Sequence, residues 1–333
     1  MDDVLARAAA IADEVLFPAA NATDASPLLP RSTLDRLAAE GFYGIAGPRE
    51  AGGRDLDAAT TARVVEVLAS GCLTTTFVWL QHRNPVRAVA GSGTPGLREA
   101  WLEPLCAGER RAGIALAGER PGPPLLSARA DGNDLLLDGE APWVSGWGVI
   151  DVVMVAARRG DRVVRALVDA TAGPTLAVDP LHLVAVNASG TVTLRFDGHR
   201  VPAERIVGDE PLEAVLGRDA AGLRMNGSLA LGVIRRCLTL LGPHALEAEL
   251  EAARAGLDAA GAAALPAARA RACELAVRAA SALVVAGGAR SILAGHHAER
   301  LAREALFLLV FGSRPAIRDA LLERISGPPP SVA

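Results

Sequence analysis

The feature that most constrains the fold is a change of sequence pattern between residues 109 and 210. On either side of this segment apolar side chains recur at helical spacing, whereas within it short apolar runs alternate with Asp-Gly and Gly-Asn turns at roughly ten-residue spacing. The pattern predicts an α+β multidomain protein: a helical domain over 1–108, a β domain of barrel or sandwich type over 109–210, and a second helical domain over 211–326. A loose tail, 327–333, is expected to follow.

Composition and charge argue against two classes of partner. All 34 basic residues are arginine, the formal net charge is −4, and no run of basic residues is present, so a nucleic-acid groove is not expected. The first residues are acidic and amphipathic rather than a basic leader, and no apolar run of membrane-spanning length is free of charges and Gly/Pro breaks. We therefore expect a cytoplasmic protein without a membrane partner. Its four cysteines are expected to be buried, reduced thiols: Cys72, Cys106, Cys237 and Cys273.

Four segments together carry a family resemblance. They are LDRLAAEGFYGIAGPREAGGRDLD (34–57), GTPGLREAWLEPLCAGERRAGIAL (93–116), ADGNDLLLDGEAPWVSG (130–146) and VNASGTVTLRFDGHRVPAERIVG (186–208). In this order and spacing they resemble the acyl-CoA dehydrogenase superfamily, over nearly the whole chain. The resemblance implies that family's fold, with a shortened helical bundle over 211–326, FAD held between the last two domains, and dimers or tetramers. It also implies oxidation of an acyl thioester, in which a carboxylate takes the α-proton and a hydride passes from the β-carbon to the flavin.

The resemblance assigns cofactor contacts to seven residues. Trp143 and Ser145 match a tripeptide that lies against the flavin ring, and Ala117 stands where a threonine hydroxyl is usual. A pair of glycines matches a loop that reaches a neighbouring subunit's flavin, and a serine after the last bend keeps a hydroxyl. The residues alone fit equally a core tryptophan, a turn serine and helix-ending glycines. The seven candidates are Leu116, Ala117, Trp143, Ser145, Gly287, Gly288 and Ser313.

The position of the family's catalytic glutamate holds an aromatic residue. Alignment of REALFLLVFGSRPAIRDALLERI (303–325) by its Arg-Glu-Ala and its glycine places Phe311 there, and a phenyl ring cannot accept a proton. Glu304 precedes it by two helical turns and better fits a structural pairing. Asp219 aligns poorly with an alternative base position. The catalytic residues are therefore left unknown.

Two further pairs of residues are candidate ligands, one for the flavin diphosphate and one for a metal ion. The family's Arg-x-Gln-Phe-Gly loop, which reaches the partner's flavin diphosphate, is not found in the chain. Arg235 and Arg236 could replace its charge, but we expect them to be solvated helix arginines. His296 and His297 lack a carboxylate or cysteine at ligand spacing, so a solvated pair at a helix start is favoured and no metal is predicted.

Three functions remain open on the sequence. The chain could be a flavoprotein oxidoreductase subunit without its own base, a pseudoenzyme that completes the flavin site of a full-length acyl-CoA dehydrogenase. It could instead be a self-sufficient flavin-dependent oxidase or monooxygenase that acts on a small molecule or a carrier-bound substrate. Thirdly, it could be a flavin-free scaffold or binding module. FAD is expected, held by the chain alone or only with a partner, in a homodimer, a homotetramer or a heteromer that binds an acyl thioester or a related small molecule.

Overall fold

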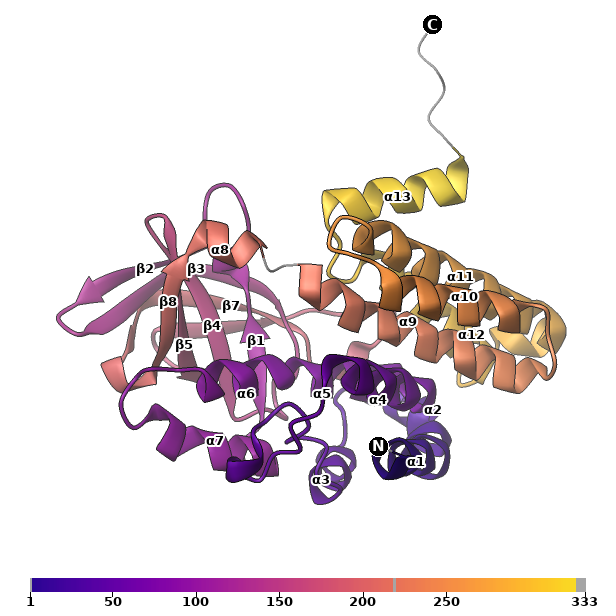
Figure 1. The fold of residues 1–333 in the computed structure, drawn as a ribbon, viewed down its shortest axis with the longest axis horizontal. Coiled ribbons are helices and arrows are strands. Elements are labelled where there is room, and N and C mark those ends of the chain that lie inside the picture. Colours follow the sequence, from indigo (N-terminus) through magenta and orange to yellow (C-terminus); the bar gives the residue numbers. More distant parts are fainter. Residues whose placement is uncertain (1, 218–219, 328–333) are drawn as a thin grey trace, which may run out of the picture.

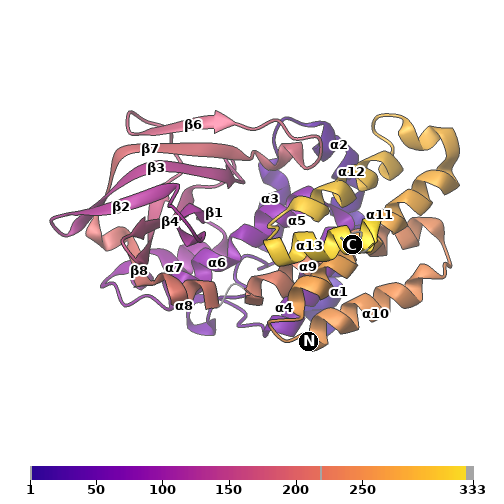
Figure 2. The same cartoon turned by 90° about the horizontal axis from the view of Figure 1, so that it is seen from above.

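Helices form the first third of the chain in the computed structural model, which describes residues 2–217 and 220–327 (Figure 1). A helical run consists of α1 (Asp2–Ile11), a π-helical turn (Ala12–Leu16) and α2 (Phe17–Ala25). The next helices are α3 (Arg31–Ala39), α4 (Ala58–Gly71), α5 (Leu73–Gln81), α6 (Arg83–Ala90) and α7 (Leu97–Ala107). In both views α6 and α7 lie along the β domain, whereas α1 and α4 lie against the C-terminal bundle (Figure 2).

Two of these helices pass through the centre of the molecule. The Asp57 carboxylate begins α4 by accepting a hydrogen bond from the Thr60 amide at 2.7 Å, as expected of an N-cap residue. From Thr60 to Gly71 every residue of α4 except Arg63 is buried, and α5 is buried from Leu73 to Leu80. Such all-round burial fits helices that are covered on several sides. The central placement of α5 matters for the candidate site described below.

The middle of the chain forms one mixed eight-stranded sheet. Its order is β6-β7-β3-β2-β4-β5-β8, and β1 pairs in parallel with β4. The core of this domain draws residues from β1 through β7, so the sheet wraps around its own apolar interior. The predicted β domain is thus confirmed, as one curved sheet. The strands are β1 (Ala112–Ala115), β2 (Leu126–Asp131), β3 (Asp134–Val144), β4 (Val152–Arg159), β5 (Arg162–Asp169), β6 (Leu176–Pro180), β7 (Val192–Val201) and β8 (Ile206–Pro211).

A helical bundle forms the last part of the chain. After α8 (Leu212–Gly217), which packs on the β domain, come α9 (Ala220–Leu241), α10 (Leu246–Ala259), α11 (Leu265–Gly287), α12 (His297–Val310) and α13 (Pro315–Ser326). Helix α9 packs on α4 and α11, and α11 also contacts α12 and α13. Apart from Gly327, the predicted tail lies outside the described residues.

One helical stretch of the described chain, Leu265–Ile292, is long and apolar enough to cross a membrane by length and composition. Its most apolar window has a mean hydropathy of 1.4 and is 39% buried inside the protein. The stretch includes the charged Glu274 and Arg278. It is also a central helix of the bundle, and core helices of soluble proteins meet the same criterion.

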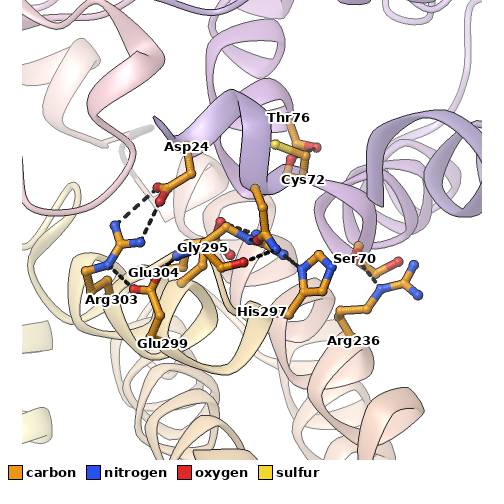
Figure 3. A network of polar contacts seen from close by, with 12 residues as sticks. Asp24, Ser70, Cys72, Thr76, Arg236, Gly295, His297, Glu299, Arg303 and Glu304 are labelled. Carbon is orange, nitrogen blue, oxygen red and sulfur yellow. Dashed lines mark hydrogen bonds and ion pairs between the residues drawn. The ribbon is translucent and has the colours of Figure 1, made fainter. Parts of the chain in front are cut away.

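Arginines of the bundle bind the N-terminal helices and thereby fix α12 (Figure 3). Arg303 bonds the Asp24 carboxylate of α2 at 2.5 Å and the Val184 carbonyl of the β domain at 2.9 Å. Arg303 therefore connects all three parts of the protein. Arg236 of α9 donates to the Ser70 carbonyl at 2.6 Å. The contacts of Arg303 hold α12 against the other two parts, and the predicted catalytic position lies at the end of this helix.

Candidate functional site

Trp143 is held outward by a β-bulge. On β3 the paired positions Ala141 and Val144 are three residues apart, whereas their partners on β7, Leu194 and Val192, are two apart. The extra residue places Trp143 at φ +65° with 60% of its surface exposed. A bulky residue in this conformation costs on the order of 1–3 kcal/mol, and bulges often redirect a side chain beside a functional site. The bulge therefore exposes an indole ring that a core tryptophan would bury.

Ser145 takes part in a chain of three buried hydroxyls. Its Oγ lies 2.8 Å from the Oγ1 of Thr191, which in turn lies 2.7 Å from the Oγ of Ser189. Two backbone bonds fasten the same segments together: the Gly146 amide donates to the Ser189 carbonyl at 2.7 Å and the Trp147 amide to the Gly190 carbonyl at 3.1 Å. The Ser145 hydroxyl is thus anchored from inside the β domain, directly after the exposed indole.

The predicted turn at Leu116 and Ala117 is fixed from behind by an arginine. Ala117 is buried and Leu116 half-buried, at the start of a 3-10 turn over Ala117–Glu119 that contacts β3. Arg158 donates from Nε to the Gly118 carbonyl at 3.0 Å and from its terminal nitrogen to the Arg120 carbonyl. Because backbone groups carry the predicted contact, replacement of the family threonine by Ala117 leaves the turn itself intact.

Phe311 packs into a cluster of three phenyl rings. Its centroid lies 4.9 Å from that of Phe77 in an edge-to-face arrangement and 5.3 Å from that of Phe307 in a stacked one, and the rings of Phe77 and Phe307 are 5.2 Å apart. Arg269, which is buried, donates to the carbonyls of Phe311 and Gly312. The bend that carries the catalytic carboxylate in the family is therefore retained here, with an apolar cluster in place of the acid.

Helix α5 touches both halves of the site. Phe77 belongs to the phenyl cluster, and the next residue, Val78, lies beside the loop after Ser145: a Cβ added to Gly146 would come within 3.4 Å of its Cγ1. Ser313, just past the bend, is exposed and its amide donates to the Val310 carbonyl at 3.3 Å. The aromatic bend and the Trp143 segment are thus joined through one buried helix.

Gly287 and Gly288 lie apart from these residues. They end α11, and Gly288 has a φ of +60°, which favours glycine. Both overall views show the α11–α12 connection at the end of the bundle away from the β domain (Figures 1 and 2). One chain does not bring this loop to Trp143, so a shared site would need a second chain.

Glu304 forms a buried ion pair, which confirms the structural pairing expected from the sequence. Its Oε1 accepts from Arg300 at 2.5 Å, and both side chains are 1% exposed. Burial raises the pKa of the Glu304 carboxyl, and its second oxygen has no hydrogen-bond partner. Asp219, the weaker candidate for a base, lies outside the described residues.

Two predictions about helix residues are wrong for one member of each pair, Arg236 and His297, whereas His296 is exposed at the start of α12, as predicted. Arg236 is buried rather than solvated; besides Ser70 it binds Asp13, and its guanidinium lies 4.0 Å from the centre of the Phe17 ring. The His297 ring stacks on the same Phe17 ring, with the two ring centres 4.2 Å apart, and burial lowers the pKa of His297 to about 4. Both residues hold the N-terminal helices against the bundle. Tertiary packing that a helical pattern cannot reveal explains both errors.

The remaining candidate ligands show no metal geometry. Within residues 2–217 and 220–327, no group of three or more His, Cys, Asp or Glu side chains could hold a metal ion. All four cysteines are free and buried, as predicted. Burial raises the thiol pKa values, to about 12 for Cys237, so these thiols are poor nucleophiles at neutral pH.

Sequence reasoning missed several residues that shape the site. Phe77 and Phe307 come from helices 230 residues apart in the chain, and Arg269 comes from a third helix. The chain has six phenylalanines, and their positions in the sequence do not indicate that three of them meet. The Ser-Gly-Thr sequence at 189–191 is part of a segment that carries the family resemblance, but the sequence does not predict that the Ser189 and Thr191 hydroxyls bond to Ser145.

The residues around Trp143 fit the ring of a flavin. Such a ring needs an apolar wall and a few fixed polar groups. The strained, exposed indole supplies the first, and the anchored Ser145 hydroxyl with the backbone turn at Leu116 supplies the second. These residues would hold the ring, and the flavin when bound would supply hydride acceptance.

Comparisons with known proteins agree with this architecture. A sequence profile of the acyl-CoA dehydrogenase N-terminal domain matches residues 2–109. Human mitochondrial short-chain specific acyl-CoA dehydrogenase is 25% identical over 240 residues, which cover 68% of this chain and 58% of the human protein. Benzylmalonyl-CoA dehydrogenase of Aromatoleum aromaticum is 27% identical, over 72% of this chain and 65% of that protein. The chain therefore matches about three fifths of the length of these relatives.

A solved structure defines the class of fold. Glutaryl-CoA dehydrogenase from Mycobacterium smegmatis, in complex with FADH2, superposes with a TM-score of 0.82 at 19% identity, covering 98% of this chain and 94% of that one. The helical, sheet and helical parts are thus those of an acyl-CoA dehydrogenase fold. Residues 2–109 thus match the N-terminal domain of acyl-CoA dehydrogenases, and the chain as a whole is similar to that superfamily in sequence and in fold.

Proposed function

We propose that the chain is an acyl-CoA dehydrogenase-like flavoprotein subunit that supplies part of a flavin site but not the catalytic base. The observation that carries the proposal is the phenyl cluster at the bend. Phe311 is packed between Phe77 and Phe307, so the bend offers no acceptor for the α-proton of a thioester. Chemistry of the family's kind then needs a carboxylate from another chain.

The buried acid on the same helix does not replace the missing base. Glu304 lies two turns before Phe311, is 1% exposed and is engaged by Arg300. A general base has to come within hydrogen-bond reach of the proton it removes. A carboxylate enclosed between α12 and the N-terminal helices does not meet this condition.

The surface of the bundle supports association with another chain. Seven large aliphatic side chains on its last helices and their connections are more than half exposed. They are Val285, Ile292, Leu293, Leu306, Val310, Leu322 and Ile325. Exposed apolar residues that lie close together are typical of protein interfaces. Val285, Ile292 and Leu293 flank the Gly287–Gly288 loop in the sequence, and this loop could complete a neighbour's site.

In such an assembly the substrate would be an acyl thioester. Its α-proton would pass to a carboxylate of the other chain, and the hydride from its β-carbon would pass to the flavin, leaving a double bond between the two carbons. This chain would contribute the Trp143 wall, the Ser145 hydroxyl and the bend.

Co-expression tests the proposal. The chain is purified alone and together with a full-length family member that carries a glutamate at its bend. We expect a stable complex whose flavin content exceeds that of either chain alone, and acyl-CoA-dependent bleaching that disappears when the partner's glutamate is changed to glutamine. Phe311→Leu in this chain, a control that keeps the bend apolar, should leave bleaching in the complex largely unchanged.

Two outcomes count against it. Bleaching of flavin by acyl-CoA with this chain alone would mean that it has its own base. A chain that is colourless alone and in every complex would instead favour the flavin-free scaffold.

A further inference from the structure

The three hydroxyls behind Trp143 form a directional chain. Ser145 follows β3, Ser189 ends the 3-10 turn Asn187–Ser189, and Thr191 precedes β7. Among the residues that the structure describes, the side chains of Ser189 and Thr191 have no hydrogen-bond partner other than these three hydroxyls. All three residues are buried, with exposed fractions of 0% for Ser189, 3% for Thr191 and 5% for Ser145.

Counting protons restricts how the hydroxyls can be oriented. Each hydroxyl has one proton and can accept through its lone pairs. Two hydrogen bonds use two of the three protons, so one proton is left over. Because Thr191 can donate to only one neighbour, the free proton resides on Ser189, on Thr191 or on Ser145.

Burial selects among these three arrangements. A free proton on Ser189 or Thr191 would be a buried donor without an acceptor, which costs about 1–3 kcal/mol. Ser145 is the most exposed of the three and follows the outward-facing Trp143 by two residues. With a flavin ring on Trp143 as the acceptor, the arrangement of lowest cost is therefore Ser189 donating to Thr191 and Thr191 donating to Ser145, which leaves the Ser145 proton free to donate to the ring.

We infer that Ser189 and Thr191 are positioning residues, which orient the Ser145 hydroxyl as a donor toward the edge of a flavin ring lying on Trp143. This inference rests on the flavin site proposed above. It assigns a role to two residues that do not touch the cofactor themselves. The backbone bonds of Gly146 and Trp147 to the same turn keep the hydroxyls in register.

The test measures FAD affinity and flavin midpoint potential, in whichever preparation of the wild-type protein takes up FAD, alone or with its partner. Thr191→Val removes the central hydroxyl at nearly constant shape, and Thr191→Ser is the matched control that retains it. Ser145→Ala removes the donor itself. Ser189→Ala is a milder change that remains informative if Thr191→Val folds poorly, which thermal unfolding would reveal.

We expect Ser145→Ala and Thr191→Val each to weaken FAD binding by about 2- to 13-fold, the range for one lost hydrogen bond. Both should shift the midpoint potential in the same direction, because both remove the same hydrogen bond to the ring. The double variant should be no weaker than Ser145→Ala alone, since both changes remove the same interaction. Thr191→Ser should stay within about twofold of wild type, and Ser189→Ala should fall between the two.

Several results would overturn the inference. If Thr191→Val leaves affinity and potential unchanged while Ser145→Ala alters them, the chain does not orient the donor. If Thr191→Ser is as damaging as Thr191→Val, packing rather than the hydroxyl is responsible. If Ser145→Ala leaves FAD affinity and midpoint potential unchanged, the Ser145 hydroxyl is not a donor to the flavin ring. A wild-type protein that takes up no FAD in any preparation refutes the flavin site, and this inference with it.

Discussion

Replacement of Phe311 tests whether the phenyl cluster is a structural unit. Its ring contacts those of Phe77 and Phe307 at 4.9 and 5.3 Å, and each such pair contributes about 0.5–1.5 kcal/mol beyond its area burial. Phe311→Leu keeps most of the apolar volume and loses both pairs, so we expect it to lower the free energy of unfolding by about 1–3 kcal/mol. Urea titration followed by circular dichroism measures this change.

The same position tests what the cluster does to chemistry. Phe311→Glu restores a carboxylate at the bend, close to the Arg269 guanidinium, which lies 5.7 Å from the centre of the ring it replaces. Phe77 and Phe307 still occupy the adjacent space. We therefore expect no acyl-CoA-dependent bleaching from Phe311→Glu alone. If any bleaching is gained, it should require the additional change Phe77→Ala. Phe311→Gln, which matches the size without the charge, is the control.

Two results would refute this reasoning. A Phe311→Leu variant with unchanged stability, or Phe311 and Phe77 substitutions whose effects simply add, would show that the rings do not act together. Rapid bleaching by Phe311→Glu with Phe77 intact would show that the cluster leaves the substrate position open.

Three further predictions concern contacts between the parts of the protein. Both ring nitrogens of His82 are hydrogen-bonded to backbone groups and burial lowers its pKa to about 4. In the unfolded state His82 takes up a proton near pH 6.5, whereas in the folded state it does so only near pH 4. The free energy of unfolding, measured by urea titration, should therefore fall by about 3 kcal/mol as the pH drops from about 6.5 to about 4. The fall should be smaller in His82→Asn. Arg300→Met should cost about 3–5 kcal/mol because it leaves Glu304 buried without its cation, whereas Glu304→Gln, which retains an acceptor, should cost clearly less. Arg303→Met should cost only about 1 kcal/mol, with a smaller effect at high salt, because that side chain is partly solvated.

The order of helical, β and helical parts could be predicted because it depends on local periodicity. Apolar spacing identified the two helical parts, and turn sequences identified the β part between them. The pairing of β3 with β7 is different, because it joins segments about fifty residues apart and its bulge is visible only once both strands are in register. The exposure of Trp143 follows from that bulge, so the sequence alone could not distinguish it from a core tryptophan.

The candidate site was predicted in part for the same reason. Phe311 could be placed at the catalytic position by alignment, and Glu304 could be assigned to a structural pair by its spacing. The neighbours that give Phe311 its environment come from distant helices, as do the contacts that bury Arg236 and His297. Local sequence carries no signal for such contacts. All seven cofactor assignments stay predictions: Leu116, Ala117, Trp143, Ser145, Gly287, Gly288 and Ser313.

The most direct test of the account is an anaerobic absorbance spectrum of the purified chain loaded with FAD, recorded before and after addition of acyl-CoAs of increasing length. The account predicts that the flavin bands persist with every acyl-CoA, and that they bleach only after a full-length partner with an intact glutamate is added. Stoichiometric bleaching by this chain alone, with any acyl-CoA, would contradict the claim that its bend no longer holds a proton acceptor.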